Sequence, residues 1–154
     1  MRAALKEAEK AFRKEEIPVG TVSVMGGKII ARAQNLKEMR QDATAHAEIL
    51  CLQKTFKKLK RWRLSEVLFF STLEPCAMCA GALVQARIGK LVYATKDPKA
   101  GAAGSIIDLL QEKAFNHRIP VEAGLLEKES RDLLQSFFAG LRKRGKRKKR
   151  KKIG

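Results

Sequence analysis

Apolar residues recur along the chain with two different periods. In residues 1–15, Leu5, Ala8 and Phe12 follow the spacing of an amphipathic helix. Residues 67–72 are instead nearly all apolar, which is typical of a strand buried on both faces. Because helical and strand-like segments alternate, the pattern predicts an α/β domain with helices on both faces of a central sheet.

Turn residues separate the predicted elements. The Gly26-Gly27 pair lies between two strand-like runs and favours a hairpin, and Pro75 suits the first turn of a helix. Residues 97–105 are rich in Pro, Gly and Ala and predict a loop. We expect helices at residues 1–15, 45–58, 75–87, 106–115 and 128–144, and about five strands, at residues 18–25, 28–33, 67–72, 90–95 and 119–123.

Length and composition fit one globular domain. The chain has 154 residues, of which 45% are hydrophobic, enough to bury a core. No run approaches the ~18 apolar residues of a membrane span. The first sixteen residues hold four Glu, which argues against a transit peptide, so we expect a cytoplasmic protein.

The charge of the chain is strongly basic and unevenly distributed. The net charge is +17, and residues 141–154 contain ten Lys and Arg but no acidic residue. Without those ten residues the net charge is +7, so we divide the chain into a domain at residues 1–140 and a basic tail at 141–154. Such a tail is either solvated and disordered or bound to a polyanion, and we favour contact with RNA phosphates.

Two short motifs contain residues with metal and acid–base chemistry. His46 and Glu48 open one predicted helix, and Cys76 and Cys79 open the next. Cysteines three residues apart at a helix start share one face, where the free N–H groups stabilise thiolates. With a neutral imidazole they form three Zn²⁺ ligands and leave the fourth position for water, which is typical of catalytic zinc sites. We expect one zinc ion per chain.

Glu48 is assigned as the proton shuttle rather than as a ligand, because a fourth protein ligand would close the site. Positions two apart on a helix do not face each other, so His46 and Glu48 converge only if the site lies beyond the helix N-terminus. Asp42 and Thr44 are good N-caps and place a helix start nearby. An isolated Cys-x-x-Cys also occurs in redox proteins, but a thioredoxin-like function leaves His46 and Glu48 without a role.

The chain resembles bacterial tRNA-specific adenosine deaminases over roughly residues 1–140. The combination of His-x-Glu with Pro-Cys-x-x-Cys is the signature of zinc deaminases. The resemblance extends to the segments Ile17-Pro18-Val19-Gly20, Thr44-Ala45-His46-Ala47-Glu48-Ile49, Leu73-Glu74-Pro75-Cys76-Ala77-Met78-Cys79-Ala80-Gly81-Ala82, Arg87-Ile88-Gly89, residues 97–105 and Asn116-His117-Arg118. It implies a three-layer α/β/α, cytidine-deaminase-like fold with a mixed sheet, a homodimer, and hydrolysis of adenosine to inosine at the wobble position of a tRNA anticodon.

The resemblance also implies substrate contacts. It places a base-contacting amide at Asn35, a pocket residue at Val19 and a residue near the ribose of the preceding nucleotide at Asp97. From the residues alone, Asn35 and Asp97 also suit turns, and Val19 also suits a core. Phe137 or Phe138 is a candidate for stacking on RNA, with Phe137 preferred, although an aromatic residue on a helix often belongs to the core.

Three other functions compete with this interpretation. The early motifs are shared with guanine and cytosine or nucleoside deaminases, but the basic charge argues against a small neutral substrate. The chain could also be a non-catalytic zinc-bearing RNA-binding subunit, although such subunits lack the shuttle carboxylate that Glu48 provides. A purely structural zinc module would need a fourth Cys or His nearby, and the sequence has none.

Overall fold

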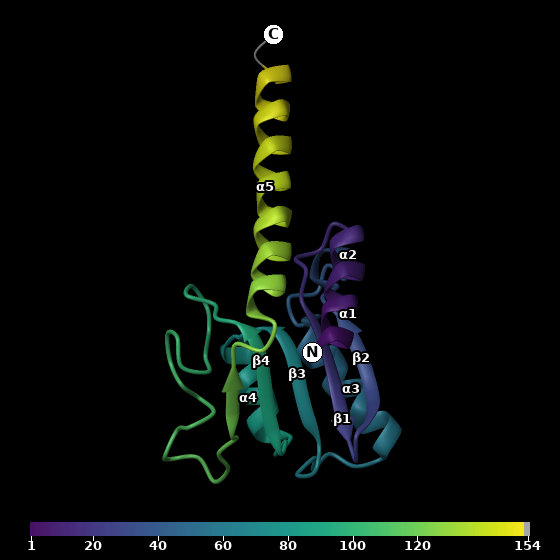
Figure 1. Cartoon of the computed structure of the whole chain (residues 1–154), viewed down its shortest axis with the longest axis vertical. Helices are drawn as coiled ribbons and strands as arrows, with labels where there is room; N and C mark the ends of the chain where they lie inside the picture. Colours follow the sequence, from purple (N-terminus) through teal and green to yellow (C-terminus); the bar gives the residue numbers. More distant parts are fainter. Residues whose placement is uncertain (153–154) are drawn as a thin grey trace.

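The structure, a computed structural model, describes the backbone of residues 1–152 and the side chains of residues 1–145. Its centre is a five-stranded sheet with the order β2-β1-β3-β4-β5 (Figure 1). The pairs β1–β2 and β1–β3 are antiparallel, while β3–β4 and β4–β5 are parallel. The strands are β1 (Gly20–Met25), β2 (Lys28–Gln34), β3 (Leu68–Leu73), β4 (Lys90–Thr95) and β5 (Val121–Ala123).

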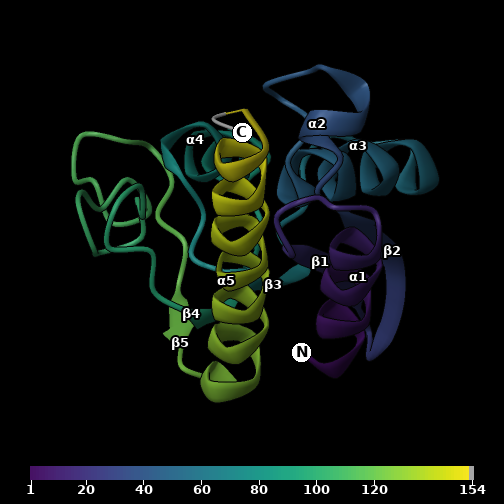
Figure 2. The same ribbon diagram turned by 90° about the horizontal axis from the view of Figure 1, so that it is seen from above.

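Helices cover both faces of this mixed sheet, so the fold is a three-layer α/β/α sandwich (Figure 2). One face packs against α1 (Arg2–Arg13) and α5 (Glu127–Lys152). The other packs against α3 (Ala47–Leu59), which lies beside α4 (Ala77–Gln85). A short helix, α2 (Lys37–Arg40), follows β2. The predicted fold class is therefore confirmed.

Small residues bring α1 directly onto the sheet. Ala4, Ala8 and Ala11 are completely buried on one face of α1. A Cβ atom added at Gly20 of β1 would lie 2.1 Å from the carbonyl oxygen of Ala4, so only glycine permits this approach. The opposite face of the sheet carries the main core, which includes Leu50, Phe69, Leu83, Ile88 and Leu91. This core holds the starts of α3 and α4 in a defined place relative to β3.

The helix predicted at residues 106–115 is wrong. In this segment the backbone pairs mainly with the preceding loop: the N–H of Ile106 donates to Gly101, and that of Leu109 donates to Ala102. Ile106 and Phe115 are 59% and 42% exposed, so the apolar residues do not form one buried stripe. The remaining elements agree with the predicted ranges to within a few residues, except that α2 was not predicted and α5 continues to Lys152.

Helix α5 extends well beyond the sheet (Figure 1). Its end includes most of the basic tail, although the side chains of residues 146–152 and all of residues 153–154 lie outside the described part of the chain. Among the described helices, none combines the length and the apolar composition that a bilayer span requires.

Candidate active site

Two helices begin close together near the end of β3. His46 is the N-cap of α3 and Cys76 is the N-cap of α4, and both have extended backbone angles. Glu48 and Cys79 lie in the first turns of these helices. All four side chains therefore project from helix N-termini, where free N–H groups stabilise negative charge.

The position of His46 explains how the side chains of His46 and Glu48, which are two residues apart, converge. Since His46 precedes α3, helical rotation does not separate its side chain from that of Glu48. The helix starts near the expected place, but its N-cap is His46 rather than Asp42 or Thr44. Asp42 instead closes a turn, because its carboxylate accepts hydrogen bonds from the backbone N–H and the hydroxyl of Thr44 at 2.8 and 2.7 Å.

The predicted ligand atoms have the spacing of a tetrahedral metal site. Nδ1 of His46 lies 3.6 Å from Sγ of Cys76 and 3.5 Å from Sγ of Cys79, and all three atoms lie within 4.8 Å of one another. Bonds of ~2.3 Å to sulfur and ~2.0 Å to nitrogen at tetrahedral angles require N and S to lie about 3.5 Å apart. The donor set therefore fits zinc. Among the described residues, no fourth His, Cys or carboxylate joins this group.

Without a metal, the pKa values of the two thiols in this group are shifted in opposite directions. A hydrogen bond from Cys79 lowers the pKa of the Cys76 thiol to about 4. The same bond, together with burial, raises the pKa of Cys79. The site therefore holds one thiolate readily, and a cation must displace the proton of the second thiol to recruit it.

Glu48 is a buried carboxyl beside the group of His46, Cys76 and Cys79. Only 4% of the residue is exposed. Burial, together with the negative charge of Cys76, raises the pKa of Glu48 to about 7, whereas hydrogen bonds from its own backbone N–H and from Cys79 and the charge of His46 oppose the shift. A carboxyl with a pKa near neutrality can both accept and donate protons at physiological pH, as a proton shuttle requires.

A cavity of about 190 Å³ opens beside these residues. The cavity brings together most of the predicted site, namely Val19, Asn35, His46, Glu48, Cys76 and Asp97. Cys79 is fully buried behind it and does not line it. The walls are completed by Ile17, Lys37, Ala47, Leu73, Glu74 and Ala100. Residues distant in sequence thus surround one small pocket next to a group of side chains that could hold a metal ion.

The comparisons with known proteins agree with this geometry. The family model of MafB19-like deaminases matches residues 1–142. The chain is 49% identical over 146 residues to the tRNA-specific adenosine deaminase of Bacillus subtilis (strain 168), covering 95% of this chain and 91% of that protein. This chain belongs to the tRNA-specific adenosine deaminase family. The predicted family is therefore confirmed.

Two solved structures place the deaminase among its relatives. A structure from a study of A-to-I editing by tRNA:A34 deaminases at the wobble position of transfer RNA has a TM-score of 0.84 and 40% identity, covering 87% of this chain and 97% of that one. A guanine deaminase from Bacillus subtilis has a TM-score of 0.61 and 32% identity, covering 77% and 79% of the two chains. The deaminase is thus more similar to the tRNA enzyme in both sequence and shape.

Asn35 of the deaminase is held in one orientation. Its Nδ2 donates to the Ile17 carbonyl at 3.3 Å and to Glu16 at 3.5 Å, and its Oδ1 accepts from the N–H of Lys37 at 3.3 Å. Glu16 is completely buried and also accepts from the N–H groups of Glu38 and Met39. One buried carboxylate therefore organises this wall of the pocket.

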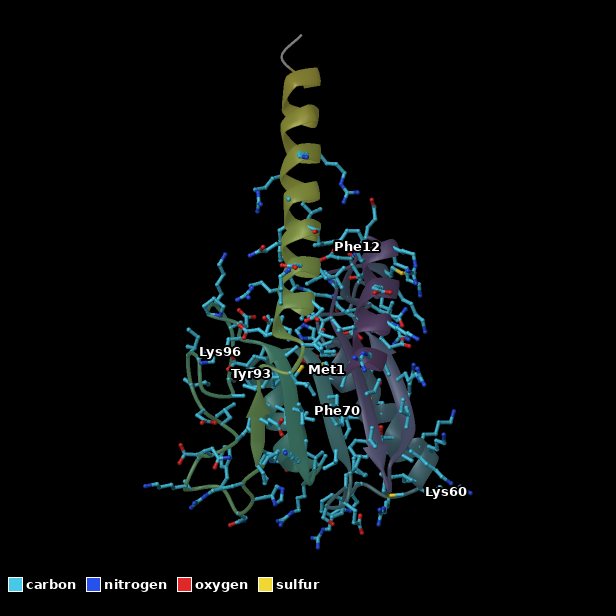
Figure 3. All side chains as sticks on the ribbon, viewed as in Figure 1. Met1, Phe12, Lys60, Phe70, Tyr93 and Lys96 are labelled. Atoms are coloured by element: carbon cyan, nitrogen blue, oxygen red, sulfur yellow. The ribbon has the colours of Figure 1, made fainter. Side chains whose placement is uncertain are left out.

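The preferred aromatic candidate, Phe137, does not fit a stacking role. The residue is only 4% exposed and packs edge-on against Phe12 of α1, with ring centroids 5.7 Å apart. Figure 3 labels Phe12 near the C-terminal end of α1. A buried ring leaves no face for a base, so the prediction for Phe137 is not supported. The alternative, Phe138, is 40% exposed and lines a second cavity of about 750 Å³ between α5 and the 95–99 segment.

Glu74 is a further pocket residue, which the sequence motifs did not indicate. Glu74 lies between β3 and Cys76, is 2% exposed and lines the cavity. Its position directly before a Pro-Cys motif was visible in the sequence, but its hydrogen-bond partners lie 23 to 31 residues away. No local sequence pattern predicts such long-range hydrogen bonds.

Proposed function

We propose that the deaminase hydrolyses adenosine to inosine at the wobble position of a tRNA anticodon, with one zinc ion held by His46, Cys76 and Cys79. The observation that carries this proposal is the three-donor cluster beside Glu48 in a pocket of about 190 Å³. Three protein ligands leave a coordination position for water, as catalytic zinc sites do.

The residues divide the work of the reaction. Bound zinc would lower the pKa of a water molecule and so supply the nucleophile. Glu48 accepts one proton from this water and delivers it to N1 of the adenine. It then takes the proton of the new C6 hydroxyl and delivers it to the departing amino group, which leaves as ammonia. Its pKa of about 7 suits both the acceptance and the donation of protons. Water and adenosine are thereby converted to ammonia and inosine.

The base is selected by the rest of the pocket. The fixed amide of Asn35 contacts the purine, while Val19 packs against it. Asp97 lies at the opening shared by the two cavities and is proposed to contact the ribose of the nucleotide on the 5′ side. A base in an anticodon loop enters such a pocket more easily than one in a duplex, because it is not paired.

The remaining surface supplies affinity for RNA. The second cavity shares Ile17, Leu73 and Asp97 with the first, and cationic Lys96, Lys99, Arg131 and Arg142 line it. We propose that flanking nucleotides bind there, with Phe138 rather than Phe137 as the stacking residue, and that the basic tail at residues 141–154 adds phosphate contacts. A homodimer and a cytoplasmic location remain predictions from the resemblance and the sequence.

A substrate comparison separates this function from its rivals. Metal-replete protein is incubated in parallel with tRNA, free guanine and cytidine, and the release of ammonia is followed. We expect ammonia from tRNA only. Ammonia from guanine or cytidine alone would establish a small-molecule deaminase, and tRNA binding with no ammonia from any substrate would indicate a non-catalytic RNA-binding subunit.

A further inference from the structure

The carboxylate of Glu74 is surrounded by donors from a single loop. Its Oε2 accepts from the N–H of Asp97 at 2.9 Å and from the Ser105 hydroxyl at 2.5 Å. Its Oε1 accepts from the N–H groups of Ala103 and Ser105, both at 3.0 Å. Each oxygen thus has two donors, and within residues 1–145 no cationic side chain forms an ion pair with Glu74.

This arrangement explains why a charged group is stable at a site only 2% exposed. Burial of a carboxylate is unfavourable unless its lone pairs are satisfied, and four donors satisfy them here. The loop in turn has little regular structure, so the carboxylate replaces the hydrogen bonds that a helix or sheet would provide. A Cβ atom added at Gly101 would lie 2.4 Å from Oε2 of Glu74, so glycine is required where the loop passes the carboxylate.

The same loop forms a wall of the pocket. Asp97 and Ala100 line the cavity on the loop side, and Cys76 lines it on the side of α4. Two backbone contacts join the sides: the N–H of Ala102 donates to Pro75 at 2.9 Å, and Gly101 forms an isolated antiparallel bridge with Cys76. Glu74 lies two residues before Cys76, so one short segment holds both a metal ligand and the anchor of the loop.

We propose that Glu74 is a positioning residue, which fixes the 97–105 loop relative to Cys76 and so sets the pocket wall that orients the RNA nucleotide. This inference rests on the proposed function as far as the substrate is concerned. Glu74 does not contact the reacting atoms in this role. It acts through Asp97, whose backbone N–H it holds, and through the course of the loop between Asp97 and Ser105.

The variant Glu74→Gln tests the proposal with almost no change in volume. An amide has one acceptor oxygen, so its NH₂ group must replace one carboxylate oxygen. The Ser105 hydroxyl can rotate and accept a hydrogen bond from that NH₂ group. The backbone N–H of Asp97 can only donate, so it loses its acceptor and faces another donor. Ser105→Ala removes one hydroxyl donor but leaves the three backbone donors, so it provides a milder second variant.

Two measurements on the metal-replete full chain test the positioning role of Glu74. Hydrogen exchange of the 97–105 amides should accelerate about tenfold or more in E74Q and less in S105A, while α4 stays protected. For tRNA deamination, KM should rise about tenfold in E74Q, with zinc content retained and kcat changed less than KM.

Other results would overturn the proposal. Unchanged exchange in both variants would show that Glu74 does not hold the loop. Faster exchange with an unchanged KM, or a fall in kcat alone with loss of zinc, would show a purely structural role. If E74Q does not fold, the exchange and KM of S105A decide in the same way. If the wild-type protein makes no inosine, the proposed function fails, and the exchange data with the Kd for an anticodon stem-loop RNA still test the positioning role.

Discussion

Replacing Glu48 with Gln should lower activity and raise the stability of the metal-free protein at the same time. The residue is 4% exposed, and burial raises its pKa from 4.5 to about 7. Each pKa unit corresponds to about 1.4 kcal/mol, so the ionised carboxylate in this site, where burial is the largest cause of the shift, costs about 3 kcal/mol net. Gln has similar volume and no charge, and it removes this cost.

The size of this stability gain depends on pH. Below pH 4.5 the carboxyl is protonated in both the folded and the unfolded chain, and E48Q should equal the wild type. Between pH 4.5 and 7 only the unfolded chain loses the proton, so the wild-type protein loses stability as pH rises. Above pH 7 the difference should stay near about 3 kcal/mol in favour of E48Q. Urea unfolding of chelator-treated protein at pH 4 and pH 8 measures it.

Activity should change in the opposite direction. Loss of a proton shuttle lowers kcat by about 10²–10⁴, or roughly 3–5 kcal/mol of barrier. Zinc should be retained, because Glu48 does not belong to the three-donor group. The control is Glu9→Gln on the exposed side of α1, which should change neither property. An E48Q protein that is less stable than the wild type at pH 8 would refute the burial argument, and loss of zinc would make Glu48 a ligand.

Three further results are expected. Elemental analysis should find about one zinc per chain, and His46→Ala should lower this content sharply; a metal-free preparation with full activity would contradict the metal site. The thiol of Cys51, which is fully buried and whose pKa burial raises to about 12, should resist thiol reagents at pH 8, where roughly one molecule in 10⁴ carries the thiolate; rapid modification of this residue in the native protein would show that α3 opens readily. Deletion of residues 142–154 should weaken binding to cognate and non-cognate tRNA by similar factors and flatten the dependence of log affinity on log salt, since fewer counterions are released. An unchanged salt slope would mean that the tail does not touch RNA.

The sequence predicted those parts of the site that local patterns encode. A Pro-Cys-x-x-Cys segment opens α4 and a His-x-Glu segment opens α3, because helix N-termini have recognisable residues. The helix predicted at 106–115 failed because its apolar residues look periodic, while its backbone pairs with the loop at residues 101–103. Apolar spacing does not reveal which backbone partner a segment will take.

Tertiary contacts determine the burial and the roles of the residues that the sequence did not indicate correctly. Phe137 and Phe138 are adjacent and identical in type, and only the packing of α1 against α5 buries the first and exposes the second. Glu16 and Glu74 look like ordinary charged residues in the sequence, yet both are buried. Glu16 accepts from backbone N–H groups of α2, and Glu74 accepts from those of the 97–105 loop. Such roles depend on the folded chain and have no local signature.

The most direct test is mass spectrometry of the anticodon fragment from tRNA treated with zinc-loaded wild-type protein and, in parallel, with E48Q. Inosine should replace adenosine at the wobble position with the wild type, and the E48Q sample should accumulate it at least about a hundredfold more slowly. Unmodified adenosine after exhaustive incubation with a zinc-loaded wild-type protein that binds the tRNA would contradict the account, as would equal inosine formation by the two proteins.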